Sequence, residues 1–179
     1  MFDNLFRTES GQGDDARADK LGASLSVGRE MIDRRKIVSY TIPEGQTEQD
    51  VRLVDLYALL GGIVTRIPVF DHTNAVKYVI HQSLLYKFLA DQSMSAADEN
   101  REFVATSLTL QNLLETPGMR ELVQHSLCFV PIGATLTEAK DNMEKTENCQ
   151  DVFVTEHGNP DEPVQGWLTN VELLRYSKM

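Results

Sequence analysis

The sequence is poor in the features that would fix a function at once. Only two cysteines are present, Cys128 and Cys149, without the close spacing of metal or redox motifs, so we expect small buried thiols and neither a disulfide framework nor a zinc site. No apolar run approaches the roughly 18 residues of a membrane-spanning helix. The first residues also lack the pattern of a signal peptide. We therefore expect a cytoplasmic protein.

Basic residues are outnumbered by acidic ones. Seventeen Lys and Arg stand against 27 Asp and Glu, which gives a formal net charge of −10. Phosphate backbones and anionic membranes attract basic surfaces, so we expect neither nucleic acid nor a membrane as a partner. With 41% hydrophobic and 25% charged residues, the composition is otherwise that of an ordinary globular protein.

Catalytic signatures are also missing. The sequence contains no GxSxG elbow, P-loop or HExxH motif, and its four histidines do not share metal-ligand spacing. Carboxylates are abundant, but the sequence places no pair of them in a cleft for acid and base catalysis. We therefore expect a protein that is not an enzyme and that requires no cofactor or metal.

The chain does contain an internal repeat. Two pairs of segments recur 88 residues apart and a third pair recurs 85 residues apart. The pairs are IPEGQT at 42–47 with VPIGAT at 130–135, VKYVIH at 76–81 with VQGWLT at 164–169, and PVFD at 68–71 with FVTE at 153–156. Three blocks in one order predict a duplicated unit whose two copies pack together and hold ligands where they meet.

Each copy predicts the order strand, helix, strand, strand, helix, from apolar periodicity and turn residues. The first helix of each copy is expected to begin at a capping box, formed by Thr47 with Asp50 and by Thr135 with Glu138. We expect four regions: an N-terminal arm with a helix at 21–35, a first unit at 36–92 that opens with a strand at 36–41, linking helices at 93–127 broken near 116–118, and a second unit at 128–179.

These features together resemble a tandem pair of cystathionine-beta-synthase (CBS) domains, called a Bateman module. The resemblance rests on the duplicated Pro-x-Gly-x-Thr start, the Ile-Pro-Val-Phe-Asp strand and the closing segment GWLTNVE at 166–172. It covers about residues 36–176. It implies an α+β fold in which two βαββα units pack as a pseudo-twofold pair. It also implies that an adenosine nucleotide binds in the cleft between the paired domains and regulates another protein.

In that family each unit ends with glycine, two apolar residues, threonine or serine, two variable residues and aspartate. Gly166, Thr169 and Glu172 take those places in the second unit. A threonine hydroxyl beside a helix start attracts a phosphate, and a carboxylate one turn later can accept hydrogen bonds from ribose hydroxyls. Glutamate in place of aspartate moves that acceptor by roughly 1.5 Å.

The first unit departs further from this pattern. Tyr78 replaces the glycine, His81 the threonine and Leu84 the acid, so this half has no ribose acceptor. His81 can still donate to a phosphate, with Ser83 close by, and the alternative is a packed histidine.

The walls of the cleft are expected from the strand that opens with each proline-valine segment. Apolar side chains there would sandwich a purine. Arg66 would neutralise a phosphate or would be a solvated charge at a strand start. The expected wall residues are Thr65, Arg66 and Pro68 in the first unit and Asp151, Val152 and Phe153 in the second.

Two non-enzymatic functions follow. The first is a regulatory module, expected as a homodimer of paired CBS-like domains, that binds AMP, ADP or ATP and acts on an unknown regulated protein. The alternative is a structural module for dimerisation or protein interaction whose nucleotide sites are degenerate and empty, as the missing acid at Leu84 indicates.

Overall fold

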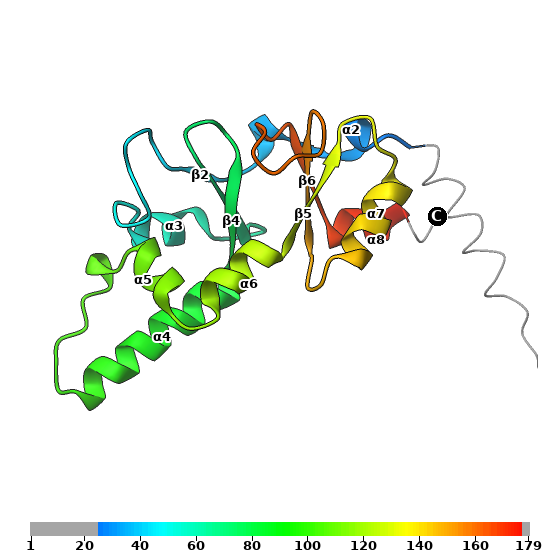
Figure 1. Ribbon diagram of the computed structural model, residues 1–179. Helices are drawn as coiled ribbons and strands as arrows, with labels where there is room; N and C mark the ends of the chain where they lie inside the picture. Colours follow the sequence, from blue (N-terminus) through cyan, green and yellow to red (C-terminus); the bar gives the residue numbers. More distant parts are fainter. Residues whose placement is uncertain (1–24, 177–179) are drawn as a thin grey trace, which may run out of the picture.

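The computed structural model describes residues 25–176 and contains two β-sheets, one in each half of the molecule, with helices around them (Figure 1). The first sheet has the order β2-β3-β4, with strands Tyr40–Thr41, Arg66–Phe70 and Val76–His81. β2 is parallel to β3, and β3 is antiparallel to β4. Helices α3 (Leu53–Leu59) and α4 (Gln82–Asp98) complete the first unit.

The second sheet repeats this arrangement with one added strand. Its order is β1-β7-β6-β5, with strands Ile32–Asp33, Gly166–Thr169, Asp151–Thr155 and Leu127–Pro131. β5 is parallel to β6, and β6 is antiparallel to β7. Helices α7 (Leu136–Lys145) and α8 (Asn170–Tyr176) complete the second unit. The expected order of strand, helix, strand, strand, helix is thus confirmed in both copies.

The strand registers confirm two of the three repeated segments. Arg66 lies opposite His81 in the first sheet as Asp151 lies opposite Thr169 in the second. Tyr78 likewise takes the place of Gly166. The separations of 85 and 88 residues that the sequence predicts are therefore structural equivalences.

The third repeated segment, Pro-x-Gly-x-Thr, is out of register. Thr41 pairs with Phe70, whereas Pro131 pairs with Thr155, the residue equivalent to Phe70. Pro43 and Pro131 therefore lie two residues apart in structural terms. Proline and glycine are favoured at several positions of a loop. Two segments that contain them can therefore match in sequence without being in the same structural register.

The two expected capping boxes have different outcomes. Thr135 caps α7, because its hydroxyl accepts from the Glu138 amide while the Glu138 carboxylate accepts from the Thr135 amide at 2.8 Å. Thr47 makes the corresponding contact with Asp50, but in a turn ahead of α3, which begins only at Leu53. The box is thus confirmed at Thr135 and wrong as a helix start at Thr47.

The N-terminal segment does not form the helix expected over 21–35. Within residues 25–35, only α2 (Val27–Glu30) is α-helical, with Ser26 as its N-cap, and residues 21–24 lie outside the described part. β1 then pairs with β7, and a 3₁₀ turn follows at Arg34–Lys36. This long-range pairing overrides the local helical pattern. The expected strand at 36–41 is confined to Tyr40–Thr41.

The link between the units is helical, as expected, and its break is confirmed. α4 continues to Asp98, beyond the expected end of the first unit at residue 92, and a 3₁₀ turn (Ala105–Ser107) follows. α5 (Leu110–Glu115) and α6 (Met119–His125) are separated by Thr116–Gly118, where Gly118 has a φ of +75°.

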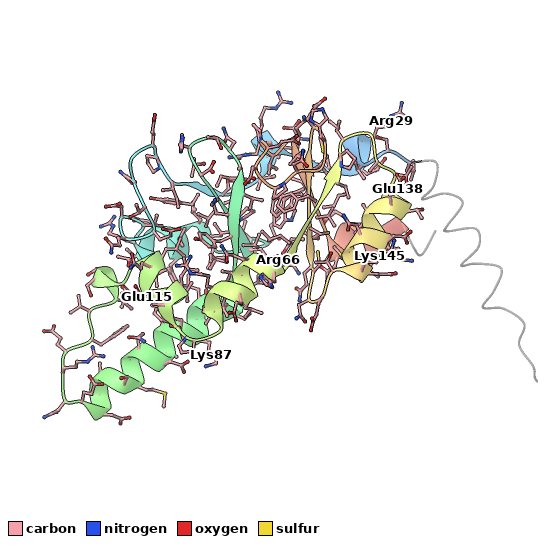
Figure 2. All side chains as sticks on the ribbon, in the orientation of Figure 1. Arg29, Arg66, Lys87, Glu115, Glu138 and Lys145 are labelled. Carbon is pink, nitrogen blue, oxygen red and sulfur yellow. The ribbon has the colours of Figure 1, made fainter. Side chains whose placement is uncertain are left out.

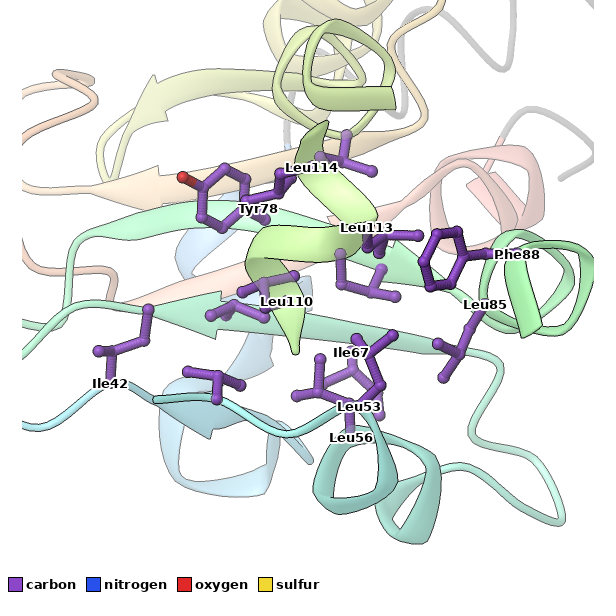
Figure 3. Close-up of a cluster of buried hydrophobic side chains, with 14 residues drawn as sticks. Ile42, Leu53, Leu56, Ile67, Tyr78, Leu85, Phe88, Leu110, Leu113 and Leu114 are labelled. Atoms are coloured by element: carbon purple, nitrogen blue, oxygen red, sulfur yellow. The ribbon is translucent and has the colours of Figure 1, made fainter. Parts of the chain in front are cut away.

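Each unit is completed by a segment from outside its own sequence range. In the first unit, leucines of α5 pack into the core of β3, β4 and α3 (Figure 3), and the Leu110 amide donates to the Val51 carbonyl at 2.7 Å. In the second, Val27 of α2 joins the core, and its amide donates to the Ala134 carbonyl at 2.9 Å. Figure 1 shows the chain crossing from α2 on the second unit to β2 in the first.

A third core joins the two units. The rings of Phe70 and Phe153 meet edge to face at 6.3 Å between centroids, and Phe153 stacks on Trp167 at 5.9 Å. Ile37 and Val79 belong to the same cluster. Because large aromatic side chains dominate the energetics of buried interfaces, this cluster holds the two units together as one body.

Candidate ligand site between the two units

Arg66 of the first unit lies at the interface and contacts residues of the second unit (Figure 2). Its Nη1 lies 2.9 Å from Asp151 Oδ1, and its Nη2 donates to Asn170 Oδ1 at 3.1 Å. It also donates to the Gln150 carbonyl at 3.2 Å. The Arg66 side chain is only 16% exposed, so the expectation of a solvated charge is wrong. Both Nη atoms are used within the protein, and we therefore assign Arg66 to interface stability and not to a phosphate.

Asp151 lies beneath this site and is fully buried. Its Oδ1 accepts from the Trp167 indole at 3.1 Å as well as from Arg66. Within residues 25–176 its Oδ2 has no hydrogen-bond partner, although His81 Nε2 lies 3.6 Å away. A buried carboxylate is costly unless it is paired, and Arg66 and Trp167 supply the contacts that offset this cost for Asp151.

Thr169 and Glu172 come together as expected, but in a local role. The Glu172 carboxylate accepts from the Thr169 amide at 3.1 Å and from the Thr169 hydroxyl. The same hydroxyl accepts from the Val171 amide at 3.2 Å. Together these contacts close the first turn of α8 in the manner of a capping box. A ribose would have to compete with this cap for the carboxylate.

Gly166 leaves room for a side chain of the N-terminal segment. A Cβ at Gly166 would lie 2.1 Å from Met31 Sδ, so Met31 takes the space that the sequence assigns to an approaching ligand. At the equivalent position in the first unit, the Tyr78 hydroxyl donates to Glu48 at 2.5 Å and accepts from Arg120 at 3.2 Å. Burial, followed by the hydrogen bond to Glu48, raises the pKa of Tyr78 to about 12.

Most of the expected wall residues are core residues. Val152, Phe153 and Pro68 are buried, because both faces of each sheet are covered, so they offer no surface to a ligand. Thr65 is exposed, and its carbonyl accepts from the Gln82 amide at the start of α4 at 2.8 Å. Gln150 does the same for the Asn170 amide at the start of α8, at 3.1 Å, which makes Thr65 and Gln150 equivalent.

A cavity of about 210 Å³ lies where both units meet the link between them. Its lining combines neutral polar groups with apolar side chains, and it includes His81 of the predicted residues. Beside it, Ser126 is 6% exposed, and its hydroxyl has no hydrogen-bond partner among residues 25–176. The lining residues are Val79, His81, Ser83, Leu84, Leu122, Val123, Ser126, Asn148 and Gln150.

Three polar lining residues, Ser126, Asn148 and Gln150, were not predicted from the sequence. Gln150 could have been found, because it is the counterpart of Thr65 in the repeat. Asn148 has a left-handed backbone with a φ of +59°, which asparagine tolerates in turns, but this signal indicates a turn and not a site. Ser126 belongs to the link between the units, where the sequence shows only apolar packing.

The lining chemistry suits a neutral, partly apolar group. Among the described residues, the cavity is lined by hydroxyl, amide and imidazole groups together with valine and leucine, and by no lysine, arginine, aspartate or glutamate. It is smaller than the roughly 300–1,000 Å³ typical of sites that enclose a whole drug-sized ligand. Its volume and polarity therefore suit an uncharged part of a larger ligand.

Among residues 25–176, no group of three or more His, Cys, Asp or Glu side chains is arranged to hold a metal ion. None of the helices in that range has the length and apolar character needed to cross a membrane.

Comparison with known proteins adds to this geometry. No sequence-family profile matches the chain, and no curated protein matches it either. Solved structures do. The CBS domain of a bacterial CNNM/CorC-family Mg²⁺ transporter superposes with a TM-score of 0.61 at 14% identity, covering 92% of this chain and 81% of that one. The same domain in complex with ATP gives 0.59 at 14% identity, with 92% and 94% covered.

A third structure, CBSX2 in complex with AMP, superposes with a TM-score of 0.50 at 18% identity, covering 84% of this chain and 94% of that chain. These likenesses agree with the repeated strand registers and with the two sheets described above. They confirm the α+β architecture expected from the repeat. The chain therefore has the fold of a CBS domain pair.

Proposed function

We propose that this protein is a non-enzymatic regulatory module that binds an adenosine nucleotide between its two units. The observation that carries the proposal is the cavity of about 210 Å³ at their junction, beside the unpartnered Ser126 hydroxyl. Support comes from structures of the same fold, of which one is a complex with ATP and another a complex with AMP. A ligand that contacts both units and the link would shift the equilibrium between two relative arrangements of the units. The size of this shift is limited by the difference between the ligand's affinities for the two arrangements.

The base of the nucleotide would enter the cavity. Ser126 and Gln150 would hydrogen-bond its edge, while Val79 and Leu84 would contact its faces. The sugar and phosphate would lie at the start of α4, a helix of 17 residues without a side-chain cap at its N-terminus, where the helix dipole favours an anion. His81 and Ser83 are the polar side chains of the lining at that point. With a net charge of −10, fewer phosphates are easier to accommodate, so AMP is expected to bind more tightly than ATP.

We propose a second nucleotide site at the corner formed by Thr169 and Glu172. Thr65, the exposed counterpart of Gln150, would belong to this site. Thr169 would donate to a phosphate and Glu172 would accept from a ribose. Because Glu172 already accepts two hydrogen bonds from Thr169, binding there requires the cap of α8 to open. We therefore expect weaker binding at this corner than in the cavity.

Calorimetric titration with AMP, ADP and ATP tests the proposal. Wild type is expected to bind AMP, and Ser126→Ala to weaken binding about tenfold, the loss typical of one hydrogen bond to a buried group. Thr169→Ala is the matched variant at the other corner and is expected to change AMP affinity little. The reverse ranking would move the site to Thr169. No heat with any of the three nucleotides in wild type would refute nucleotide binding.

One observation favours a purely structural module as the second candidate. The cavity has Leu84 where an acid would bind ribose, and the Thr169–Glu172 pair of the other corner is closed on itself. A module of this kind would form a stable assembly whose melting temperature does not change with added nucleotide. Since a ligand that binds only the folded state raises that temperature, thermal scans with millimolar AMP separate the two functions.

We also infer that the protein works as a homodimer in the cytoplasm. Its first unit would span residues 36–92, its link residues 93–127 and its second unit residues 128–179. Exposed apolar side chains on helices α3, α4 and α8 support an assembly. Tyr57 and Tyr86 are each about half exposed, with rings 5.7 Å apart, and Val171 and Leu174 are exposed on α8. Two free cysteines suit a reducing compartment. Sedimentation equilibrium tests the dimer, and a monomer at all concentrations would refute it.

A further inference from the structure

The second unit carries a groove of about 450 Å³ between β5 and α7. This groove shares no lining residue with the cavity between the units. Phe129 and Pro131 of β5, together with Ala134 of the following turn, give it an apolar wall, and side chains of α7 form its opposite, polar side. The volume is within the range of sites that enclose a small ligand, so it can also accept a few apolar side chains of a peptide.

The edge of β5 indicates how an occupant would bind. β5 is the last strand of its sheet, so its outer edge has no strand partner among residues 25–176. The Asn142 Nδ2 atom on α7 donates to the Phe129 carbonyl of this edge at 2.7 Å. An edge that is covered in this way is a poor template for an added strand. The groove therefore favours an occupant that inserts side chains, as an amphipathic segment does.

The N-terminal part of the chain enters the described region beside this groove. The Leu136 amide donates to the Leu25 carbonyl at 3.0 Å, and the Val27 amide donates to the carbonyl of Ala134, a lining residue, at 2.9 Å. Residues 1–24 precede this point and lie outside the described residues. An extended chain spans about 3.3 Å per residue, so residues 8–24 are long enough to reach the far end of the ten-residue helix α7, which is about 15 Å long.

The apolar residues of this preceding segment are concentrated at one place. Phe2, Leu5 and Phe6 have the spacing that puts side chains on one face of a helix. Residues 7–20 contain no apolar side chain larger than alanine. Residues 2–6 are therefore the part of the segment that can fill an apolar groove.

The charges of the groove match those beside the apolar residues. Asp141 and Lys145, four positions apart on α7, line the groove and are exposed, and neither has an ion-pair partner within residues 25–176. Asp3 and Arg7 are also four positions apart. In an antiparallel alignment with α7, Asp3 would lie against Lys145 and Arg7 against Asp141. The chain would then run toward the start of α7, where Leu25 lies.

We propose that residues 2–7 dock in the groove between β5 and α7 of the same chain, with Phe2, Leu5 and Phe6 against its apolar wall. A tethered segment reaches an effective concentration on the order of 1 mM, so a modest apolar contact is enough to keep it bound. This interaction does not rest on nucleotide binding, and its test needs no nucleotide.

A competition experiment on the full chain tests the docking. The probe is a fluorescent peptide of residues 1–12, and its binding is followed by anisotropy. The peptide is expected to bind the variant Phe2→Ser/Phe6→Ser, whose own segment lacks its aromatic side chains. Wild type should bind it about tenfold more weakly, because a tethered competitor at about 1 mM has this effect on a peptide with a dissociation constant of about 0.1 mM. Equal affinities for the two proteins, or no binding to either, would overturn the proposal.

The matched control is Ala16→Ser/Ala18→Ser, which places the same number of serines in the same segment outside residues 2–7. It should bind the peptide as weakly as wild type does. A gain in affinity equal to that of Phe2→Ser/Phe6→Ser would show that the aromatic side chains are not the docking element.

The groove is tested from its other side by charge reversal. Asp141→Arg, added to Phe2→Ser/Phe6→Ser, should weaken binding of the peptide, and a peptide with Arg7→Asp should restore it, because opposite charges again face each other. Amide chemical-shift changes on binding should fall within residues 129–145. Changes confined to α4 or α8 would place the site elsewhere and contradict the proposal. Competition in wild type that increases with protein concentration would place the segment on a second copy and would overturn docking within one chain.

Discussion

Arg66 of β3 and Asp151 of β6 occupy equivalent positions in the two units, and their side chains meet across the interface at 2.9 Å. Identical residues at two such positions would bring like charges together near the pseudo-twofold axis. Opposite charges make the pairing of the first unit with the second favourable. A pairing of two copies of either unit would place two arginines or two aspartates in contact. This ion pair thereby distinguishes the correct partner from a closely similar one.

Loss of Arg66 is expected to be severe. Arg66→Met leaves the fully buried Asp151 carboxylate without its charged partner, which should lower the free energy of unfolding by about 3–5 kcal/mol. Urea denaturation measures this loss. Arg52→Met is the matched control, because Arg52 pairs with Asp55 in solvent, and its effect should be far smaller. Equal effects of the two variants would show that the Arg66 pair does not hold the units together.

The two threonines of the apparent repeat should respond differently to the same change. Thr135→Ala removes the hydroxyl that caps α7 and should cost about 1 kcal/mol. Thr47→Ala should cost less, because Thr47 lies in a turn ahead of α3 and its amide contact with Asp50 remains. Urea midpoints of both variants provide the measurement, and a larger loss at Thr47 would contradict the register described here.

Substitutions at Gly166 and Met31 should have coupled effects on the free energy of unfolding. Gly166→Ala places a Cβ where Met31 Sδ now lies, and overpacking of this kind typically costs about 1–3 kcal/mol. Because the clash is with one side chain, the cost should largely disappear in a Met31→Ala background. A double-mutant cycle from unfolding free energies gives the coupling. Strictly additive effects would mean that the N-terminal segment does not cover Gly166.

Stability at high pH should depend on Tyr78. Its pKa is raised from 10.0 to about 12 in the folded protein. Between these values the unfolded chain has released the phenolic proton that the folded protein still holds, so stability falls as the pH rises. The contribution is fully present below pH 10 and is lost toward pH 12. Urea midpoints across this range should fall more steeply for wild type than for Tyr78→Phe, and parallel slopes would contradict the assignment.

Much of the architecture could be predicted from the sequence, because the pattern of buried residues fixes strand register. The equivalence of His81 with Thr169 and of Leu84 with Glu172 follows from the apolar pairs that precede them. A shift by one residue would turn that pattern to the wrong face of the sheet. The Pro-x-Gly-x-Thr segments lie in loops without this constraint, and their sequence match differs from the structural register by two residues.

The candidate site was harder to predict, because its residues are defined by contacts between distant segments. Val152 and Phe153 are apolar because they pack in the cores. The local sequence does not distinguish such core residues from residues that line a ligand site. Arg66 was expected to face solvent or phosphate because Asp151, its partner, lies 85 positions later in the chain. Ser126 carries no motif at all, and only its unpartnered hydroxyl in a packed environment makes it notable.

The exchange of segments between the two halves has a consequence for how the chain can be divided. Cutting at the end of the first unit, ahead of the link, would separate β2, β3 and β4 from the α5 leucines that fill their core, and would separate β7 from the strand β1 that covers its edge. Each fragment would expose an apolar face and an unpaired strand, both of which promote aggregation. The smallest autonomous folding unit is thus the whole interlocked pair, although the sequence repeat is only half as long.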